Sequence, residues 1–331
     1  MTANLDVGAR SDTVTLLDVV AAAQRIGPFV QQTPLERSTW LSEAANADVW
    51  LKLECFQRTG SFKLRGALNA LLSLDDAAKR QGVMTASAGN HGLGVAQAAN
   101  LTGLPATVVV PETASPAKVE LLRQTGCELI LYGPDYDTAE AYSIRLARER
   151  GVTFVSAYDH PGVVAGGGTI ALEVLETRPD TDTLIVPAGG GGLISGVALA
   201  AKGLKSAIRV IGAQSTASPA LHALLEAGTL VPVTVEDSLA DGLSGNVAAG
   251  SITVELVHRY VDEISLVSEA EIGAAMRATL EREHILIEGS AAVTVAALTS
   301  GRLSLAGRRI VLVLTGRNVA PSVLRATLGM A

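Results

Sequence analysis

Lys63 is the residue of this sequence best suited to covalent chemistry. It stands between Phe62 and Leu64 in the stretch 59–67, and further leucines follow at the spacing of an apolar helix face. A lysine in such surroundings loses hydration, which favours the neutral amine, a nucleophile that can form an imine with an aldehyde. From this stretch alone a solvated lysine is the commoner outcome, because buried lysines are rare.

Two turns that follow predicted strands carry one pattern, Ala-Gly-x-x-Gly-Leu, at 88–93 and at 188–193. Each copy follows an apolar run and opens a predicted helix. A turn of this kind presents unpaired backbone N–H groups and the positive end of a helix dipole, which together attract anions. Two such turns predict one ligand, or a pair of ligands, with two anionic ends held between two domains.

The second copy contains four successive glycines, 189–192. Tight packing of strand against helix is one explanation, but four glycines lose much chain entropy on folding, so close approach of a phosphate is favoured. A dinucleotide is disfavoured, because Ile194 or Ser195 occupies the third glycine position and Gln214 replaces the ribose-binding acid. No P-loop lysine follows. The turn therefore predicts a site for a single phosphate.

Other catalytic chemistry finds little support in this sequence. There is no Gly-x-Ser-x-Gly elbow and no His-Glu-x-x-His motif. Two cysteines cannot supply a disulfide framework or a four-thiolate metal site. The five histidines lie far apart, and His91 stands out only because it lies inside the first turn.

Composition indicates a packed globular protein with room for two domains. The chain has 331 residues, of which 48% are hydrophobic and 18% charged. The net charge of −7 and an aromatic fraction of 3% argue against nucleic acid as a partner. The first dozen residues lack an apolar core, and glycines and Pro187 interrupt the longest apolar run, 184–201. We therefore expect no signal peptide, no membrane span and a cytoplasmic location.

Strand and helix patterns alternate through most of the chain. Apolar runs rich in Val and Ile predict strands at 83–87, 106–110, 128–132, 154–157, 184–186, 210–213 and 310–314. Helical patterns separate them at 94–100, 116–125, 138–149, 169–176, 194–202 and 219–227. Strands that are apolar throughout predict an α/β protein with parallel sheets. We expect a small domain at 53–152, a large domain from 14–52 plus 153–331, and a tail at 1–13.

An imine-forming lysine and a glycine cradle for one phosphate are what pyridoxal 5′-phosphate (PLP) requires. Three segments resemble the signature motifs of the fold-type II PLP-dependent enzymes and occur in the same order: 61–67, 87–92 and 189–193. The nearest group is that of threonine/serine dehydratase and serine racemase, and the resemblance runs from about Thr33 to Val319. It implies two open, twisted, mostly parallel sheets with flanking helices, similar to tryptophan synthase β, with the cofactor in the interdomain cleft.

The resemblance also implies roles for single residues. Lys63 holds the cofactor and later moves the Cα proton of the substrate. Cofactor contacts are implied for Phe62 beside the ring, Asn90 at the phenolic oxygen, Thr315 at the pyridine nitrogen, Gly242 along the site, and Gly189, Gly190, Gly191, Gly192 and Leu193 around the phosphate. The substrate carboxylate is assigned to the loop with Ser87, Gly89, Asn90 and His91.

Thr315 has a chemical consequence within this resemblance. A hydroxyl, unlike an aspartate, need not keep the pyridine nitrogen protonated, so the ring withdraws electrons less strongly. Loss of a β-leaving group as Cα is deprotonated is then favoured over a long-lived carbanion. Without the other motifs, Thr315 would be interpreted as a strand-end cap.

The sequence departs from the family pattern at several positions. Ala88 stands where serine racemase has its second catalytic serine, which argues against a proficient racemase. The stretch 214–220 lacks the carboxylates of the family's Mg²⁺/Ca²⁺ site, so we expect no metal. Gly167 replaces a usual glutamine. Arg317 replaces a small residue and is a candidate for recognising a distal anionic or polar substrate group, although an outward arginine is an equally valid interpretation.

We therefore expect a PLP-dependent ammonia-lyase that converts a β-hydroxy-α-amino acid to a 2-oxo acid and ammonia. L-threonine or L-serine is the default substrate, and 3-hydroxyaspartate, phenylserine or a hydroxyectoine-derived amino acid are alternatives. An amino-acid racemase or β-replacement enzyme on the same scaffold is the alternative function. A non-catalytic binder of small anions is a third. The family is usually dimeric, so we expect a homodimer.

Overall fold

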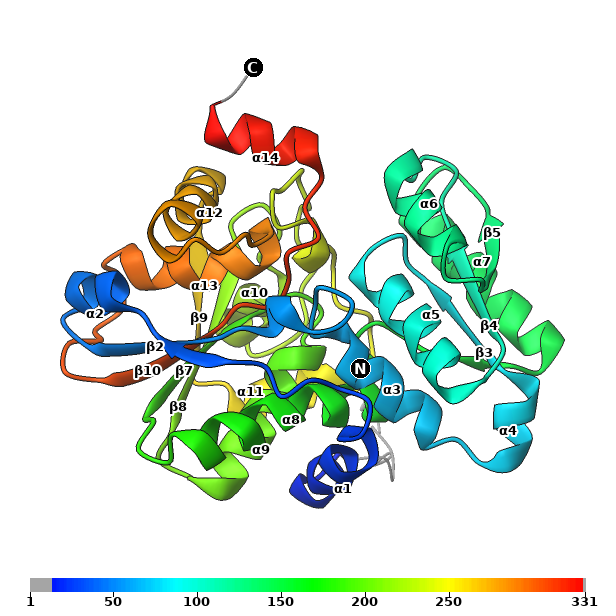
Figure 1. The fold of residues 1–331 in the computed structure, drawn as a ribbon, viewed down its shortest axis with the longest axis horizontal. Coiled ribbons are helices and arrows are strands. Elements are labelled where there is room, and N and C mark those ends of the chain that lie inside the picture. The colour runs from blue at the N-terminus through cyan, green and yellow to red at the C-terminus, as the bar shows by residue number, and fades with distance from the viewer. Residues whose placement is uncertain (1–13, 330–331) are drawn as a thin grey trace, which may run out of the picture.

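Two sheets of unequal size, each with flanking helices, make up the protein. The structure is a computed structural model and describes residues 14–329, so the predicted tail at 1–13 lies outside the described residues. The sheets lie side by side, with the larger near both described ends of the chain (Figure 1). The expected α/β architecture with two mostly parallel sheets is confirmed.

The larger sheet has six strands in the order β1-β2-β10-β7-β8-β9. β1 pairs antiparallel with β2, and every other pair is parallel. The strands are β1 (Leu35–Arg37), β2 (Asp48–Lys52), β7 (Thr183–Pro187), β8 (Arg209–Ser215), β9 (Glu263–Val267) and β10 (Arg309–Val313).

Each face of the larger sheet has its own hydrophobic core. Along β10, Val311 and Val313 face one core, while Ile310 and Leu312 face the other. The first core contains residues of α1 (Leu16–Ile26), α8 (Pro161–Thr177), α9 (Gly192–Leu204), α10 (Ala220–Ala227) and α11 (Ile252–Tyr260). The second contains residues of α2 (Thr39–Ala45), α12 (Glu269–Glu283) and α13 (Gly289–Thr299). Burial on both faces explains why the central strands β7 and β10 are mostly apolar.

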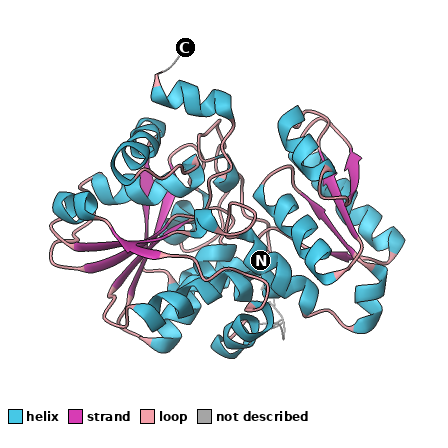
Figure 2. Ribbon diagram, in the orientation of Figure 1, coloured by secondary structure: helices cyan, strands magenta, loops and turns pink. Residues whose placement is uncertain are grey.

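The smaller sheet has four parallel strands in the order β5-β4-β3-β6 (Figure 2). They are β3 (Val83–Ala86), β4 (Ala106–Val110), β5 (Glu128–Leu131) and β6 (Thr153–Phe154). Residues of α5 (Asn90–Thr102) and α6 (Pro116–Arg123) share one core with β4, and α7 (Tyr136–Arg150) packs on the other face. Because all four strands are parallel, the loops that follow them lie at one edge of the sheet.

Further short elements complete the fold. They are α3 (Lys63–Leu72), α4 (Asp76–Gln81), α14 (Pro321–Leu328) and two 3-10 turns, η1 (Glu54–Phe56) and η2 (Asp241–Leu243). The proposed small domain, 53–152, holds three strands of the smaller sheet, and β6 follows directly. We propose the same division of domains, with β6 added to the small one.

The sequence pattern missed some elements and shortened others. It assigned nothing between 228 and 309, where the structure has α11, β9, α12 and α13. α13 is buried almost throughout, so it shows no polar face and no helical period. α8 begins at Pro161, whereas the sequence pattern predicted a start at 169. The predicted start is too late because glycines, here Gly166 and Gly168, are unusual inside a helix. These glycines allow close contact: a Cβ at Gly166 would lie 2.5 Å from the Arg65 carbonyl oxygen of α3.

Among residues 14–329, no helix combines the length and the apolar character needed to cross a membrane.

Candidate active site

Lys63 is the first residue of α3, and its amine points into the protein. Its Nζ donates a hydrogen bond to the Ala157 carbonyl oxygen at 3.0 Å, just after β6. Burial lowers the pKa of Lys63 to about 8, and the charge of Glu288 opposes this shift. The side chain is half-buried, so the amine is enclosed and still reachable. A large share of this amine is therefore neutral in mildly alkaline solution, as a nucleophile requires.

The loop before Lys63 is attached to the end of β10. The Phe62 N–H donates to the Thr315 carbonyl at 3.0 Å, and the Arg317 N–H donates to the Gly60 carbonyl at 2.9 Å. These contacts join segments about 250 positions apart in the sequence. They fix the start of α3 beside Thr315. Lys63 and Thr315, which the resemblance assigns to one cofactor, therefore lie on two segments that are hydrogen-bonded to each other.

The glycine turn after β7 presents a row of free donors. Gly191 has φ of +94° and caps α9, a backbone conformation that favours glycine. Within residues 14–329, no acceptor is bonded to the backbone N–H groups of Gly189, Gly190, Gly191, Gly192 or Leu193. A row of free N–H groups at the positive end of α9 can bind a phosphate.

Neighbouring residues explain why side chains are excluded from this turn. A Cβ at Gly190 would come within 2.6 Å of the Tyr158 ring, and one at Gly192 within 2.8 Å of the Tyr158 backbone. A Cβ at Gly191 would come within 2.8 Å of Thr253. The Thr253 hydroxyl also donates to the Gly190 carbonyl at 2.8 Å, and this hydrogen bond stabilises the turn.

Tyr158 also connects the glycine turn to Lys63. It directly follows Ala157, the acceptor of the Lys63 amine, and its ring packs on Gly190. Lys63 and the cradle at 189–193 therefore meet at one place, although more than a hundred residues separate them in the sequence. A phosphate-bearing aldehyde fits this pair of features.

Asn90, in the turn after β3, lies in a polar network that reaches the larger sheet. Its Nδ2 donates to Glu288 Oε1 at 2.7 Å, and Asn318 Nδ2 donates to Asn90 Oδ1 at 2.7 Å. The Asn318 N–H donates to Glu288 Oε2 at 2.9 Å. No sequence motif indicates Glu288 or Asn318, since a single acid or amide outside a motif gives no signal of its own.

Glu288 is a buried carboxyl group that is only 6% exposed. Burial raises the pKa of Glu288 to about 7, although the hydrogen bond from Asn90 opposes the shift. The group therefore titrates near neutrality, next to an amide that the motifs assign to the cofactor.

The His91 side chain faces away from the turn in which it stands. Its ring Nε2 lies 3.0 Å from the Val155 carbonyl oxygen, and burial lowers the pKa of His91 to about 3. The neutral ring donates from Nε2, and within the described part of the chain its Nδ1 has no hydrogen-bond partner. The backbone N–H of His91 is therefore the group that this residue presents within the turn itself.

The remaining predicted residues lie around the same region. Ser87 Oγ accepts a hydrogen bond from the Gly89 N–H at 3.1 Å and shapes the turn before Asn90. The Gly242 N–H donates to Ser290 Oγ at 3.1 Å in the exposed η2 turn. Thr315 is only 3% exposed and is the second residue after β10.

Arg317 follows Thr315 but faces the outside. It is exposed, and its guanidinium lies 5.2 Å from the centre of the Phe56 ring. This placement corresponds to the outward interpretation of Arg317 and gives no support to contact with a substrate.

Side-chain oxygens of the stretch 214–220 accept hydrogen bonds from the protein itself. Gln214 Oε1 accepts from the His222 N–H at 3.0 Å, and Ser218 Oγ accepts from the Gly245 N–H at 3.0 Å. No group of three or more His, Cys, Asp or Glu residues suited to a metal occurs within residues 14–329.

Comparison with known proteins agrees with this geometry. Residues 26–316 match the family described as pyridoxal-phosphate dependent enzyme. The chain belongs to this family. PLP is its cofactor, and the free N–H groups at 189–193 together with Lys63 fit that molecule. The family match confirms the fold and the cofactor that the three motifs predicted.

Similar proteins indicate the group to which this PLP-dependent enzyme belongs within its family. L-threonine ammonia-lyase of Geobacter sulfurreducens is 43% identical, over 90% of this chain and 74% of that protein. The catabolic L-threonine dehydratase TdcB of Escherichia coli K12 is 40% identical, over 92% and 93%. The structure of maize serine racemase superposes with a TM-score of 0.90 at 34% identity and covers 96% of this chain and 97% of that one. The predicted group, threonine/serine dehydratase and serine racemase, is thus confirmed.

Proposed function

We propose that this PLP-dependent enzyme is an ammonia-lyase for L-threonine or L-serine, with a 2-oxo acid and ammonia as products. The observation that carries the proposal is the enclosed amine of Lys63 beside a turn of free N–H groups. Relatives named for threonine support the choice of substrate, at 40% and 43% identity.

When bound, PLP supplies an electron sink next to the Cα atom of an amino acid. In our proposal the N–H groups of 189–193 hold its phosphate, and the Asn90 amide contacts its phenolic oxygen. Phe62 packs beside the ring, the Thr315 hydroxyl faces the ring nitrogen, and Gly242 lines the site. The loop of Ser87, Gly89, Asn90 and His91 binds the substrate carboxylate through the Ser87 hydroxyl and the backbone N–H groups of Asn90 and His91. The Gly89 N–H shapes this loop by its hydrogen bond to Ser87 Oγ.

Lys63 has the central chemical role in this proposal. Burial keeps the pKa of Lys63 at about 8, so its Nζ is available as a base close to physiological pH. Lys63 Nζ takes the proton from Cα of the substrate and returns a proton during product formation. The Ala157 carbonyl, at 3.0 Å, orients this amine when it is free.

Two residues favour elimination over racemisation. Thr315 presents a neutral hydroxyl rather than a carboxylate, which favours departure of the β-hydroxyl group once Cα loses its proton. Ala88 has no proton to donate, so the face opposite Lys63 lacks the acid that a two-base racemase requires. A racemase or a β-replacement enzyme stays the alternative on this scaffold.

Arg317 bears on the choice among β-hydroxy amino acids. Its guanidinium stacks on Phe56 at the surface, which gives an anionic substrate such as 3-hydroxyaspartate no special support. Threonine and serine are therefore preferred. The homodimer and the cytoplasmic location stay predictions.

A substrate screen with the PLP-loaded protein tests the proposed function. L-threonine, L-serine, 3-hydroxyaspartate, phenylserine and a hydroxyectoine-derived amino acid are each supplied, and 2-oxo acid and ammonia are measured together. We expect equal amounts of both products, with L-threonine or L-serine turned over fastest. Inversion of recovered amino acid without ammonia would identify a racemase instead, and no reaction at all would favour an anion binder.

A further inference from the structure

The helix that carries Lys63 begins in an unfavourable way. Phe62, the N-cap residue of α3, makes no side-chain capping bond, and the first turn contains no acid. It contains two basic residues instead, Lys63 and the charged Arg65. Positive side chains at the N-terminal end of a helix oppose its dipole, and a missing cap costs about 1 kcal/mol. Contacts outside the helix must therefore fix where α3 starts.

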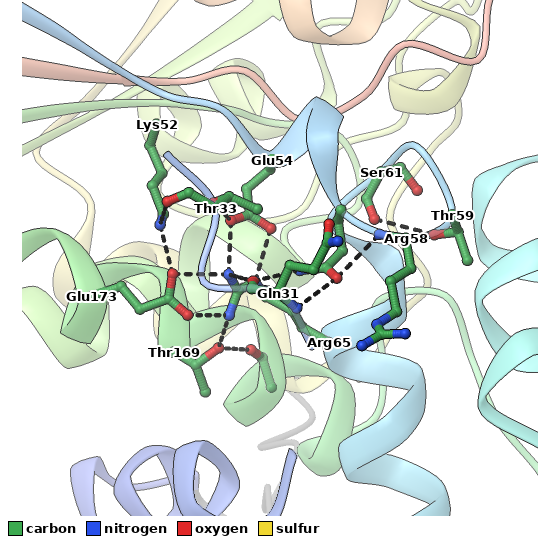
Figure 3. A network of polar contacts seen from close by, with 12 residues as sticks. Gln31, Thr33, Lys52, Glu54, Arg58, Thr59, Ser61, Arg65, Thr169 and Glu173 are labelled. Atoms are coloured by element: carbon green, nitrogen blue, oxygen red, sulfur yellow. Dashed lines mark hydrogen bonds and ion pairs between the residues drawn. The ribbon is translucent and has the colours of Figure 1, made fainter. Parts of the chain in front are cut away.

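Arg65 supplies such contacts from a fully buried position (Figure 3). Its guanidinium binds Glu54 at 2.8 and 2.9 Å and Glu173 at 2.6 and 2.9 Å. Each carboxylate thus accepts two hydrogen bonds from one planar guanidinium. We call this pair of two-bond contacts, one to Glu54 and one to Glu173, the double fork. It fixes both the position and the plane of the Arg65 side chain.

The outer members complete the network without leaving a net charge. Lys52 Nζ donates to Glu173 Oε2 at 2.5 Å, and the Thr33 hydroxyl donates to Glu54 Oε1 at 2.5 Å. Lys52 and Arg65 balance Glu54 and Glu173. A buried ion network of this kind adds little net stability over apolar packing, but removal of one partner leaves an uncompensated buried charge and is strongly destabilising.

The network joins α3 to the elements that border the site. Glu54 lies in η1, directly after β2, and Glu173 lies on α8. The backbone of α8 touches that of α3, as the 2.5 Å approach of a Cβ at Gly166 to the Arg65 carbonyl shows. α8 begins shortly after Ala157, the acceptor of the Lys63 amine. Arg65 therefore fixes α3 against α8, the helix that follows the loop containing the acceptor of the amine.

We propose that Arg65 is a positioning residue, whose double fork to Glu54 and Glu173 fixes the first turn of α3 and thereby the Lys63 amine. The proposal rests on the proposed function of Lys63. Arg65 touches neither cofactor nor substrate in this role. Its effect is on how the Lys63 Nζ is placed.

The decisive variant is Arg65→Lys, tested in the PLP-loaded enzyme. Lysine keeps the buried positive charge but cannot make two forks. We expect kcat to fall about 100-fold with KM changed less than about 3-fold, because a misplaced group mainly impairs the chemical step. The fraction of bound PLP that borohydride reduction attaches to Lys63, measured by peptide mass, should fall as well. Circular dichroism monitors folding.

Arg178→Lys is the matched control. Arg178 also binds two carboxylates, Asp48 at 2.9 Å and Asp180 at 2.9 and 3.0 Å, and neither of these partners belongs to α3. We expect kcat and attachment at Lys63 to stay within about 2-fold of wild type, since this ion pair is partly exposed.

Glu173→Gln keeps the proposal testable if Arg65→Lys does not fold. It removes one charged fork and leaves the fork to Glu54, so we expect about a 10-fold loss of kcat and partial loss of attachment. A folded variant of either kind with wild-type kcat and wild-type attachment overturns the role of Arg65. Wild-type protein that never attaches PLP at Lys63 overturns the proposed function instead, so the two failures can be told apart.

Discussion

One pattern, Ala-Gly-x-x-Gly-Leu, ends a strand in each sheet, but the two copies work differently. At 188–193 the variable positions are glycines, neighbouring residues exclude side chains, and the backbone N–H groups stay free. At 88–93 the variable positions are Asn90 and His91, whose side chains reach Glu288 and Val155. We call the copy at 188–193 the backbone site. We call the copy at 88–93 the side-chain site, because the Asn90 side chain adds to its backbone N–H groups while the His91 ring faces away.

The glycines of the two copies show the same difference. A Cβ at Gly89 would have only Ser87 Oγ nearby, at 3.9 Å, whereas a Cβ at Gly189 would lie 2.9 Å from Leu243. The last glycine of each copy leaves no room for a side chain. A Cβ at Gly92 would lie 2.1 Å from the Ser87 carbonyl oxygen, and a Cβ at Gly192 would lie 2.8 Å from Tyr158. The shared part of the pattern therefore serves the strand-to-helix turn, and the variable part selects what the turn can bind.

Removal of the amine next to the backbone site should have the largest effect. Lys63→Ala should lower kcat by about 10³-fold or more, because it removes the proposed base and attachment point. Binding of pyridoxamine 5′-phosphate, which keeps the phosphate contacts and forms no covalent bond with Lys63, should change less than about 3-fold. Steady-state kinetics and fluorescence titration measure the two effects. Joint loss of both would mean that the cradle does not bind phosphate independently.

Alanine in the two turns should then separate them. Gly191→Ala places a Cβ against Thr253 at a φ of +94°, and we expect a loss of about 2–4 kcal/mol in stability together with weaker PLP retention. Gly89→Ala has room for its Cβ and should cost less than about 1 kcal/mol. Urea unfolding and dialysis of bound PLP measure both variants. Equal losses would contradict the distinction between the turns.

A change of pH should affect the side-chain site through Glu288. Its pKa is raised from 4.5 to about 7 in the folded protein, so the folded state binds the proton more tightly. Stability from this group is complete below pH 4.5 and is lost as pH rises through 7. Because Glu288→Gln does not titrate, its Tm relative to wild type should increase by about 2 °C or more over that interval. A constant difference in Tm between pH 4.5 and 7.5 would show that Glu288 titrates normally.

Arg317 belongs to neither turn and should matter least. Arg317→Ala loses the contact with Phe56, worth about 0.5–1 kcal/mol, and should leave kcat and KM for L-threonine within about 3-fold of wild type. Thermal unfolding and steady-state kinetics measure these effects. A selective rise of KM for 3-hydroxyaspartate would instead assign Arg317 to substrate recognition.

Much of the fold and of the site could be predicted from local patterns. The strands that lead into both turns are buried on both faces, so their apolar runs were visible, and Lys63 stands in a recognisable motif. Glu288 and Asn318 could not be predicted, because each acts through partners about 200 or more positions away. The direction of the His91 ring was equally hidden, since a glycine-rich turn does not indicate which side of the sheet a side chain faces.

The sequence by itself determined the chemical groups: one lysine in apolar surroundings, two strand-end turns, and a hydroxyl after β10. These are local properties, set by neighbours within a few residues. Only the tertiary structure decided that Tyr158 brings Lys63 to the glycines, that Glu288 holds Asn90, and that Arg65 lies between Glu54 and Glu173. Those contacts depend on how strands and helices pack, and packing joins residues whose separation in the chain carries no local signal.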